Sequence, residues 1–292
     1  MPAKSPVLTL DDGASIPQIG FGTLNVQPDR AATRENVDTT ARVVAEALEV
    51  GYRHFDTAQM YGSERGIGKA IAESGVPRDE LFITSKLANG NHRPDDVQRS
   101  FDETLENLGV DHLDLFLIHW PLPTRYDGDY VSTWKAVAAL RDDGRLGAAG
   151  VSNFLPHHLT RILEGTGIVP AVNQIEVHPH FRNTEACDAS TAHGIAVEAW
   201  SPLGQGKELD DPVIADVAEA HQATVAQVIL AWHLAQGRIV IPKSAHQQRM
   251  RENIEAVQLK LTDDDIAAID RLDQGETGRV GPHPDTFDWI PE

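Results

Sequence analysis

The sequence predicts an α/β fold, a (β/α)8 barrel of the TIM type with an N-terminal β-hairpin. Two observations predict it. The chain has 292 residues, which is a usual length for one such barrel. Short apolar segments alternate with amphipathic ones, and the strand candidates are apolar on both faces, as strands of a parallel sheet are. We therefore expect one barrel domain over residues 1–292, without a dividing linker or repeat.

The N-terminal segment is expected to form the hairpin, because Val7 to Leu10 alternate before the turn signal DDG. The barrel strands then follow in the order IGFGT, YRHFDT, LFITSKL, LDLFLIHW, LGAAGVSN, AVNQIEVH, IAVEAWSP and RIVIPKS. The predicted helices between them include Asp38–Val50, Asp95–Gly109, Val131–Asp143 and Val225–Leu234. Gly109 and Gly144 stand where helix C-caps belong. A doubly wound sheet is the alternative, but GIGKAI lacks the third glycine of a dinucleotide fingerprint and the Ser/Thr of a P-loop.

Composition excludes several classes of function. The net charge of −19 argues against nucleic acid or an anionic membrane as the main partner. The single cysteine, Cys187, allows neither a disulfide framework within the chain nor a cysteine-based metal site, which fits a cytoplasmic setting. The N-terminus lacks the apolar core of a signal peptide, and no apolar run approaches the roughly 18 residues that span a bilayer.

Polar residues stand at the ends of the predicted strands, where the chemistry of a barrel gathers. In chain order they are Asp56 with Tyr61 just beyond it, Lys86, His119, Ser152, Asn153, Gln174, Trp200, Ser201, Lys243 and Ser244. Each has a structural explanation on its own: Asp56 as a turn cap, Tyr61 as packing, His119 as a satisfied core histidine. A buried Lys86 is harder to explain, because an ammonium group needs a partner. The conjunction of these residues favours a common site.

Four of these side chains could together form a general acid. A phenol with a pKa of about 10 is a poor acid at neutral pH, and the ammonium group of Lys86 would lower the pKa of Tyr61. Asp56 would keep Lys86 charged, and His119 would polarise or orient a carbonyl group. This arrangement predicts that Tyr61 protonates an oxygen. Because side chains offer no hydride, the matching reductant would be a nicotinamide cofactor.

The segment IPKSAHQQRMRENI places Lys243, Ser244 and Arg249 between a strand end and a helix start. In so acidic a chain this cationic group is a local exception. One interpretation is a solvated helix face. The other is a phosphate site built from cations and helix amides, which would suit the 2′-phosphate of NADP.

Seven motifs together resemble the aldo-keto reductase family. They are GYRHFDTAQMYGSERGIGKAI, FITSKL, LDLFLIHWP, GVSNF, VNQIEVHP, AWSPLG and IPKSAHQQRMREN, in family order over most of the chain. The resemblance implies a barrel that binds NADP(H) without a Rossmann fold and a tetrad matched by Asp56, Tyr61, Lys86 and His119. It implies reduction of a small-molecule aldehyde or ketone by a monomer, with Tyr61 as the proton donor.

The resemblance also assigns cofactor contacts. Ser152, Asn153 and Gln174 match the positions that hold the nicotinamide carboxamide, and Trp200 matches the ring stacked on the nicotinamide. The remaining expected contacts are Gly22, Thr23, Ser201, Leu203 and Gly204, followed by Lys243, Ser244, Arg249, Glu252 and Asn253 around the adenosine 2′-phosphate and adenine.

Substrate preference does not transfer from the family. The chain is most similar to the short-loop bacterial members, such as the 2,5-diketo-D-gluconate reductases, through EAWSPLGQG and GPHPDTFDWI. Many relatives have tryptophan where this chain has Ala88. The expected pocket is formed by Leu87, Ala88, Trp120, His283, Phe287 and Trp289. Aromatic aldehydes, dicarbonyls, keto-sugars and ketosteroids all stay open.

The sequence also offers signs of other classes of function. GVSNF fails the GxSxG pattern of a serine nucleophile, since Phe154 replaces the last glycine. The HH and HPH pairs lack a third ligand at metal-site spacing, so no metal is expected. An aldolase in which Lys86 forms a Schiff base would leave Tyr61 without a role. A barrel that binds NADPH as a regulatory partner is the non-catalytic alternative.

Overall fold

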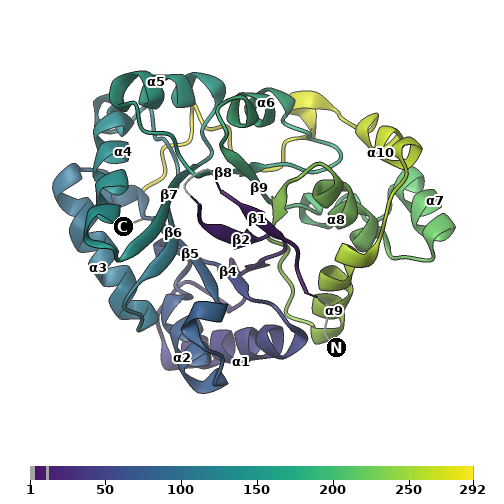
Figure 1. The fold of residues 1–292 in the computed structure, drawn as a ribbon, viewed down its shortest axis with the longest axis horizontal. Coiled ribbons are helices and arrows are strands. Elements are labelled where there is room, and N and C mark those ends of the chain that lie inside the picture. The colour runs from purple at the N-terminus through teal and green to yellow at the C-terminus, as the bar shows by residue number, and fades with distance from the viewer. Residues whose placement is uncertain (1–3, 11–12, 292) are drawn as a thin grey trace.

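The computed structural model describes residues 4–10 and 13–291, and it shows a parallel barrel surrounded by helices (Figure 1). The barrel strands are β3 (Phe21–Gly22), β4 (His54–Asp56), β5 (Phe82–Leu87), β6 (Leu113–Ile118), β7 (Leu146–Ser152), β8 (Val172–Glu176), β9 (Ala196–Trp200) and β10 (Ile239–Val240). Each pairs in parallel with the next along the chain. The ring closes where Ile19 bridges Val240, and the Gly20 N–H donates to the Val240 carbonyl at 2.8 Å. The predicted fold class is confirmed.

The helices cover the outside of the barrel. They are α1 (Arg34–Val50), α2 (Glu64–Ser74), α3 (Pro94–Leu108), α4 (Tyr130–Ala139), α5 (Pro156–Thr166), α6 (Thr184–Ala192), α7 (Pro212–His221), α8 (Val225–Ala235), α9 (Gln247–Glu255) and α10 (Asp263–Asp270). Helix α1 begins earlier than predicted, because the Thr33 side chain accepts a hydrogen bond from the Asn36 N–H and caps it. Gly109 and Gly144 end their segments in left-handed conformations, as expected.

The predicted N-terminal hairpin is confirmed as β1 (Val7–Thr9) paired antiparallel with β2 (Ser15–Pro17). The predicted turn residues 11–12 lie outside the described residues. Leu10 and Ile16 are buried against Phe82 and Leu115, at the beginnings of barrel strands. The hairpin therefore closes the N-terminal end of the barrel, and it crosses the centre of the ring in Figure 1.

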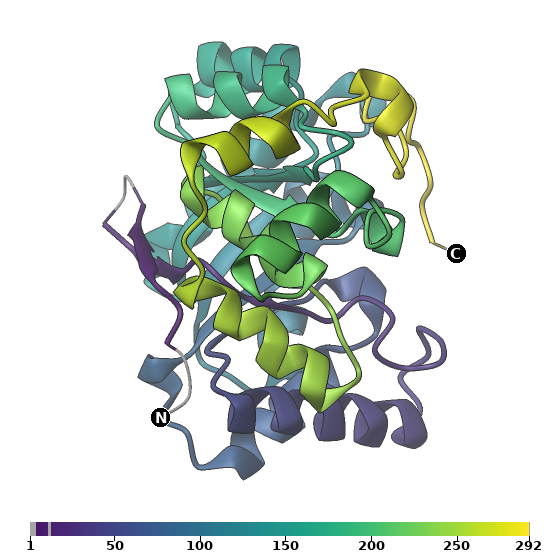
Figure 2. The same ribbon diagram turned by 90° about the vertical axis from the view of Figure 1, so that its right-hand side faces the viewer.

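The C-terminal tail, residues 279–291, lies at the opposite end of the molecule from the hairpin (Figure 2). The N–H groups of Val280 and Gly281 donate to the carboxylate of Glu176, at the end of β8. Further along, the Asn89 side chain donates to the Trp289 carbonyl at 2.8 Å. These bonds hold the tail against the open end of the barrel. Within the described ranges, no helix is long and apolar enough to cross a membrane.

Candidate active site

Lys86 and Asp56 form a buried ion pair inside the barrel. Lys86 is fully buried in β5, and its ammonium donates to both Asp56 carboxylate oxygens at 2.7 Å. A third bond reaches the Thr57 carbonyl at 2.9 Å. Burial lowers the pKa of Lys86, but attraction to Asp56 and Tyr61 outweighs it and leaves that pKa above its usual value. Lys86 is therefore charged and fully hydrogen-bonded, which argues against a free amine that forms a Schiff base.

Tyr61 and His119 lie next to this ion pair. Tyr61 ends the short turn Gln59–Tyr61, and its hydroxyl lies 3.4 Å from His119 Nε2. The Lys86 ammonium lies 4.9 Å from the centre of the Tyr61 ring. Burial, followed by the charge of Lys86, holds the pKa of His119 well below its usual value, so the imidazole is neutral. The structure thus brings all four predicted side chains together.

Lys86 lowers the pKa of Tyr61 as expected, but the net shift of that pKa is upward. Burial raises the pKa of Tyr61 above 10, and the opposing pull of Lys86 only reduces this effect. The sequence showed the neighbouring cation but not how strongly the surrounding protein, in which Tyr61 is half-buried, desolvates the hydroxyl. Tyr61 is consequently protonated throughout the neutral range.

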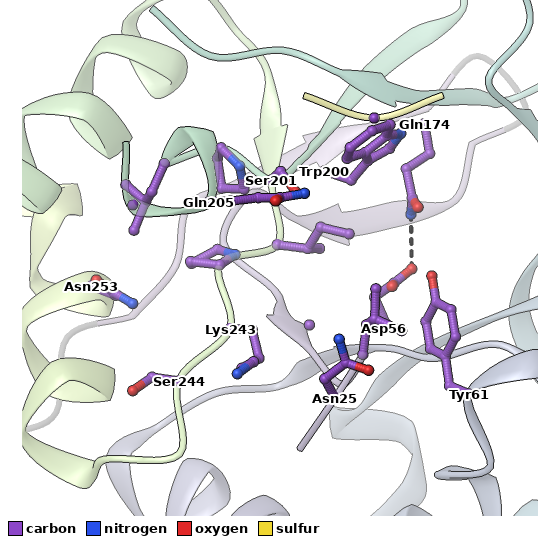
Figure 3. A pocket seen from close by; sticks show the side chains of 18 of the residues that line it. Asn25, Asp56, Tyr61, Gln174, Trp200, Ser201, Gln205, Lys243, Ser244 and Asn253 are labelled. Atoms are coloured by element: carbon purple, nitrogen blue, oxygen red, sulfur yellow. Dashed lines mark hydrogen bonds between the residues drawn. The ribbon is translucent and has the colours of Figure 1, made fainter. Parts of the chain in front are cut away.

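Glu198 is a second acid in the barrel that the sequence analysis missed. The Gln174 side chain donates to Asp56 Oδ2 and to Glu198 Oε2, both at 2.8 Å, and Figure 3 shows its bond to Asp56. Burial and the charge of Asp56 raise the pKa of Glu198 to about 8, so it is neutral at pH 7. The sequence does contain a sign of this site, because Glu198 is a charged residue in the apolar strand AVEAW. It stands two positions before Trp200, so both side chains point to the same face of the strand.

One cavity of about 1160 Å³ joins this centre to the far rim of the barrel. The volume exceeds the usual upper range of about 1,000 Å³ for a ligand pocket, so it offers room for a dinucleotide and a substrate. The predicted cofactor contacts that line it are Gly22, Ser152, Asn153, Gln174, Trp200, Ser201, Leu203, Lys243, Ser244, Arg249, Glu252 and Asn253. Thr23 and Gly204 do not line it. The Thr23 hydroxyl donates instead to the Asp56 carbonyl at 2.8 Å.

Near Tyr61, the cavity wall is braced by its own polar groups. The Trp200 indole N–H donates to Asn153 Oδ1 at 2.8 Å, and the Asn153 amide donates to the His119 carbonyl at 2.9 Å. The Ser152 hydroxyl donates to the Gln174 carbonyl at 2.8 Å. These bonds fix the Trp200 ring over the cavity, where a planar ligand ring can stack on it (Figure 3).

At the other end, Lys243, Ser244 and Asn253 face the same space (Figure 3). Lys243 and Arg249 are exposed, and neither forms an ion pair with another described residue. The first turn of α9 lies beside them and adds the positive end of a helix dipole. Two free cations and a helix N-terminus suit a phosphate group, so these residues fit the adenosine end of NADP.

The predicted substrate residues divide into two groups. Trp120 and Trp289 line the cavity, as does Phe287, whose ring centre lies 4.2 Å from that of Trp120. Leu87, Ala88 and His283 do not line it. Leu87 is buried in the core, and the Ala88 N–H donates to Gln59. Residues of the same wall that the sequence analysis missed are Leu24, Arg30 and Met60.

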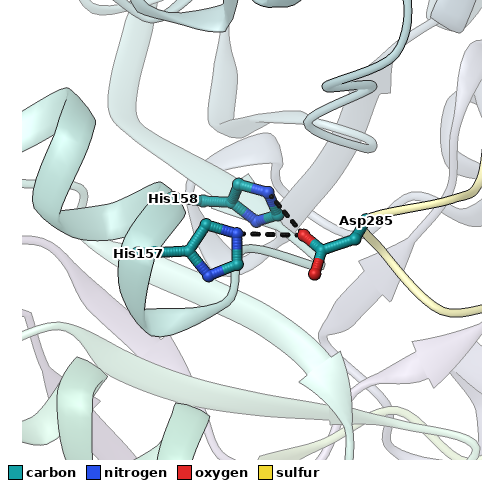
Figure 4. A group of neighbouring side chains, drawn as sticks. All are labelled: His157, His158 and Asp285. Carbon is teal, nitrogen blue, oxygen red and sulfur yellow. Dashed lines mark hydrogen bonds and ion pairs between the residues drawn. The ribbon is translucent and has the colours of Figure 1, made fainter.

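The histidine pairs do not form a prepared metal site. Figure 4 shows His157 and His158, at the start of α5, converging on Asp285 of the tail. However, His158 Nδ1 accepts a hydrogen bond from the Leu155 N–H at 3.1 Å. In neutral imidazole the proton then sits on Nε2, which lies 3.1 Å from Asp285 Oδ1. A metal would need a lone pair on that same nitrogen.

In the HPH pair, His178 is already bonded to two carboxylates. His178 is buried between Glu176 and Glu208, with which it forms hydrogen bonds. Although burial lowers it, these two carboxylates raise the pKa of His178 to about 9. The imidazole is therefore charged at pH 7 and unavailable as a ligand.

Comparison with known proteins agrees with this geometry. The chain matches the Aldo/keto reductase family over residues 18–274. It belongs to that family. An aldo-keto reductase of Mycolicibacterium smegmatis is 48% identical over 98% of this chain and 99% of its own. A glyoxal reductase of Bacillus subtilis is 43% identical over 94% of this chain and 95% of its own.

A solved structure of a Gox0644 mutant in complex with NADPH superimposes with a TM-score of 0.89, at 41% identity over 98% of this chain and 99% of that one. The predicted family and enzyme class are confirmed, and so, at the level of this reductase family, is NADP(H) as the cofactor. The family match and this relative support carbonyl reduction as the general reaction.

Proposed function

We propose that this aldo/keto reductase reduces aldehydes and ketones to alcohols with NADPH, and that Tyr61 donates the proton. The observation that carries the proposal is one continuous cavity. Asp56, Tyr61 and His119 line it at one end, where Lys86 is bonded to Asp56. Lys243 and Arg249, which have no ion-pair partner among the described residues, line it at the other end. NADPH would supply the hydride when it is bound along this cavity.

The protein's own groups would act on the carbonyl oxygen. The neutral imidazole of His119 and the Tyr61 hydroxyl mark the place where that oxygen would bind. Tyr61 transfers its proton as negative charge develops on the oxygen. An alkoxide is a far stronger base than a phenolate, so even a raised Tyr61 pKa leaves this transfer downhill. Lys86 then stabilises the phenolate, and Asp56 holds Lys86 in place.

A panel of carbonyl compounds tests the reaction class. With glyoxal and aromatic aldehydes as first members, we expect loss of NADPH absorbance in proportion to enzyme concentration. Tight NADPH binding without turnover of any panel member would instead support the non-catalytic alternative.

The rate of reduction should be almost independent of pH from about pH 6 to 9 and should fall at higher pH. The donor is the protonated form of Tyr61, whose pKa is raised, so it is lost only as pH rises through that value. His119 stays neutral over the same range because its pKa is lowered. The measurement is kcat at saturating substrate against pH. A decline centred near pH 6.5 would assign proton donation to a histidine.

Removing either cation at the far end should weaken NADPH binding selectively. We expect Lys243→Ala or Arg249→Ala to raise the Kd for NADPH by about tenfold or more, the effect of one charge-assisted hydrogen bond. The Kd for NADH should change little, and fluorescence titration measures both. Arg251→Ala is the matched control, because Arg251 lies on the same helix but outside the cavity. Equal losses for both cofactors would contradict a 2′-phosphate contact.

A further inference from the structure

The loop between β3 and α1, residues 23–33, is built against the turn that carries Tyr61. The Gln27 side chain donates to the Tyr61 carbonyl at 2.9 Å and accepts from the Thr40 hydroxyl at 2.6 Å. A β-carbon on Gly62 would overlap the carbonyl oxygen of Arg30. The backbone of Arg30 therefore packs directly on the residue that follows Tyr61.

The Arg30 side chain extends into the substrate end of the cavity. It lines the same space as Tyr61, His119 and Trp120. Its guanidinium carbon lies 5.4 Å from the centre of the Trp289 ring, within range of a cation–π contact. After burial and Lys86, its charge is the next influence that lowers the pKa of His119. Arg30 is exposed, and its side chain lies between the tail and the reacting groups.

Arg30 has no ion-pair partner among the described residues, although the chain has a net charge of −19. The carboxylate of neighbouring Asp29 instead accepts hydrogen bonds from the Ala31 N–H and from Asn36. Nearby Arg125 pairs with Asp288 of the tail at 3.0 Å. A cation that faces a binding cavity and lacks a carboxylate partner is suited to an anionic ligand.

We propose that Arg30 binds a carboxylate group on the substrate, so that this reductase prefers oxo acids. The inference rests on the proposed carbonyl reduction and adds a substrate class to it. The carbonyl lies at Tyr61 and the carboxylate at Arg30, while Trp120, Phe287 and Trp289 contact the apolar or aromatic spacer between them. A guanidinium group presents parallel N–H donors that match a carboxylate, and stacking on Trp289 limits its orientations.

The test compares 4-formylbenzoate with 4-formylbenzamide, which have nearly the same shape but differ in charge. For the unmodified protein we expect the higher kcat/KM with 4-formylbenzoate, and this advantage should shrink as ionic strength rises. Arg30→Met should lower kcat/KM for 4-formylbenzoate by about tenfold, mainly through KM, and should leave 4-formylbenzamide almost unchanged. The matched control is Arg34→Met, since Arg34 is exposed at the start of α1 and outside the cavity.

Three outcomes would overturn the assignment. An equal loss for both substrates would mean that Arg30 only supports the loop. A raised Kd for NADPH in Arg30→Met would place Arg30 against the cofactor. Equal kcat/KM for the two aldehydes in the unmodified protein would exclude a carboxylate preference while leaving carbonyl reduction intact. Failure to reduce either aldehyde, or any other carbonyl compound, would reject the proposed function itself.

Discussion

Tyr61→Phe is expected to lower kcat by about 100- to 10,000-fold, the usual contribution of general acid catalysis. The substitution removes only the hydroxyl that lies 3.4 Å from His119. The ring stays, so the cavity keeps its shape and the Kd for NADPH should not change. Stopped-flow measurement of hydride transfer, together with NADPH titration, checks both expectations.

Tyr52→Phe is the matched control for this substitution. Tyr52 is buried, and its hydroxyl donates to the Met250 carbonyl at 3.1 Å, away from the cavity. Its loss should affect stability modestly and leave kcat close to that of the unmodified protein. Unchanged turnover in Tyr61→Phe would contradict its assignment as the proton donor.

Lys86→Met should lower the free energy of unfolding by about 3–5 kcal/mol, in addition to removing most of the activity. The ammonium group gives Asp56 its cationic partner inside the barrel, where Glu198 is a second carboxyl group. Without Lys86, Asp56 must either remain charged without compensation or take up a proton. Urea denaturation followed by far-UV circular dichroism measures the loss.

A double substitution keeps this prediction testable if Lys86→Met folds poorly. Lys86→Met combined with Asp56→Asn removes both charges, and it should recover much of the lost stability without recovering activity. If the single variant proved as stable as the unmodified protein, the pair would contribute nothing to the barrel. If the double variant were active, neither charge would be needed for proton transfer.

The sequence predicted the barrel and its reacting groups because both depend on local pattern. Asp56 and Lys86 end apolar strands, and parallel strands bring such ends to one rim. Most of the predicted cofactor contacts line the cavity for the same reason. The short strand β3 was also found in this way, although only Phe21 and Gly22 are paired.

The features that were missed depend on contacts between distant segments. Arg30 enters the site because a loop packs on Gly62, and the spacing of residues gives no sign of that contact. His283 was expected in the substrate pocket but does not line it, whereas Phe287, four residues later, does. The direction of the Tyr61 pKa shift depends on desolvation of the hydroxyl by the folded protein, which no sequence pattern reports.

Substrate contact and proton transfer are carried out by different parts of this chain. Glu176 and Asn89 hold the tail through its backbone groups, whereas Arg125 and His157 bind the side chains of Asp288 and Asp285. Phe287 and Trp289 belong to this tail, and their side chains line the cavity. Substitutions at Phe287 and Trp289 would therefore change which substrates fit the cavity, while the proton-transfer groups inside the barrel stay as they are.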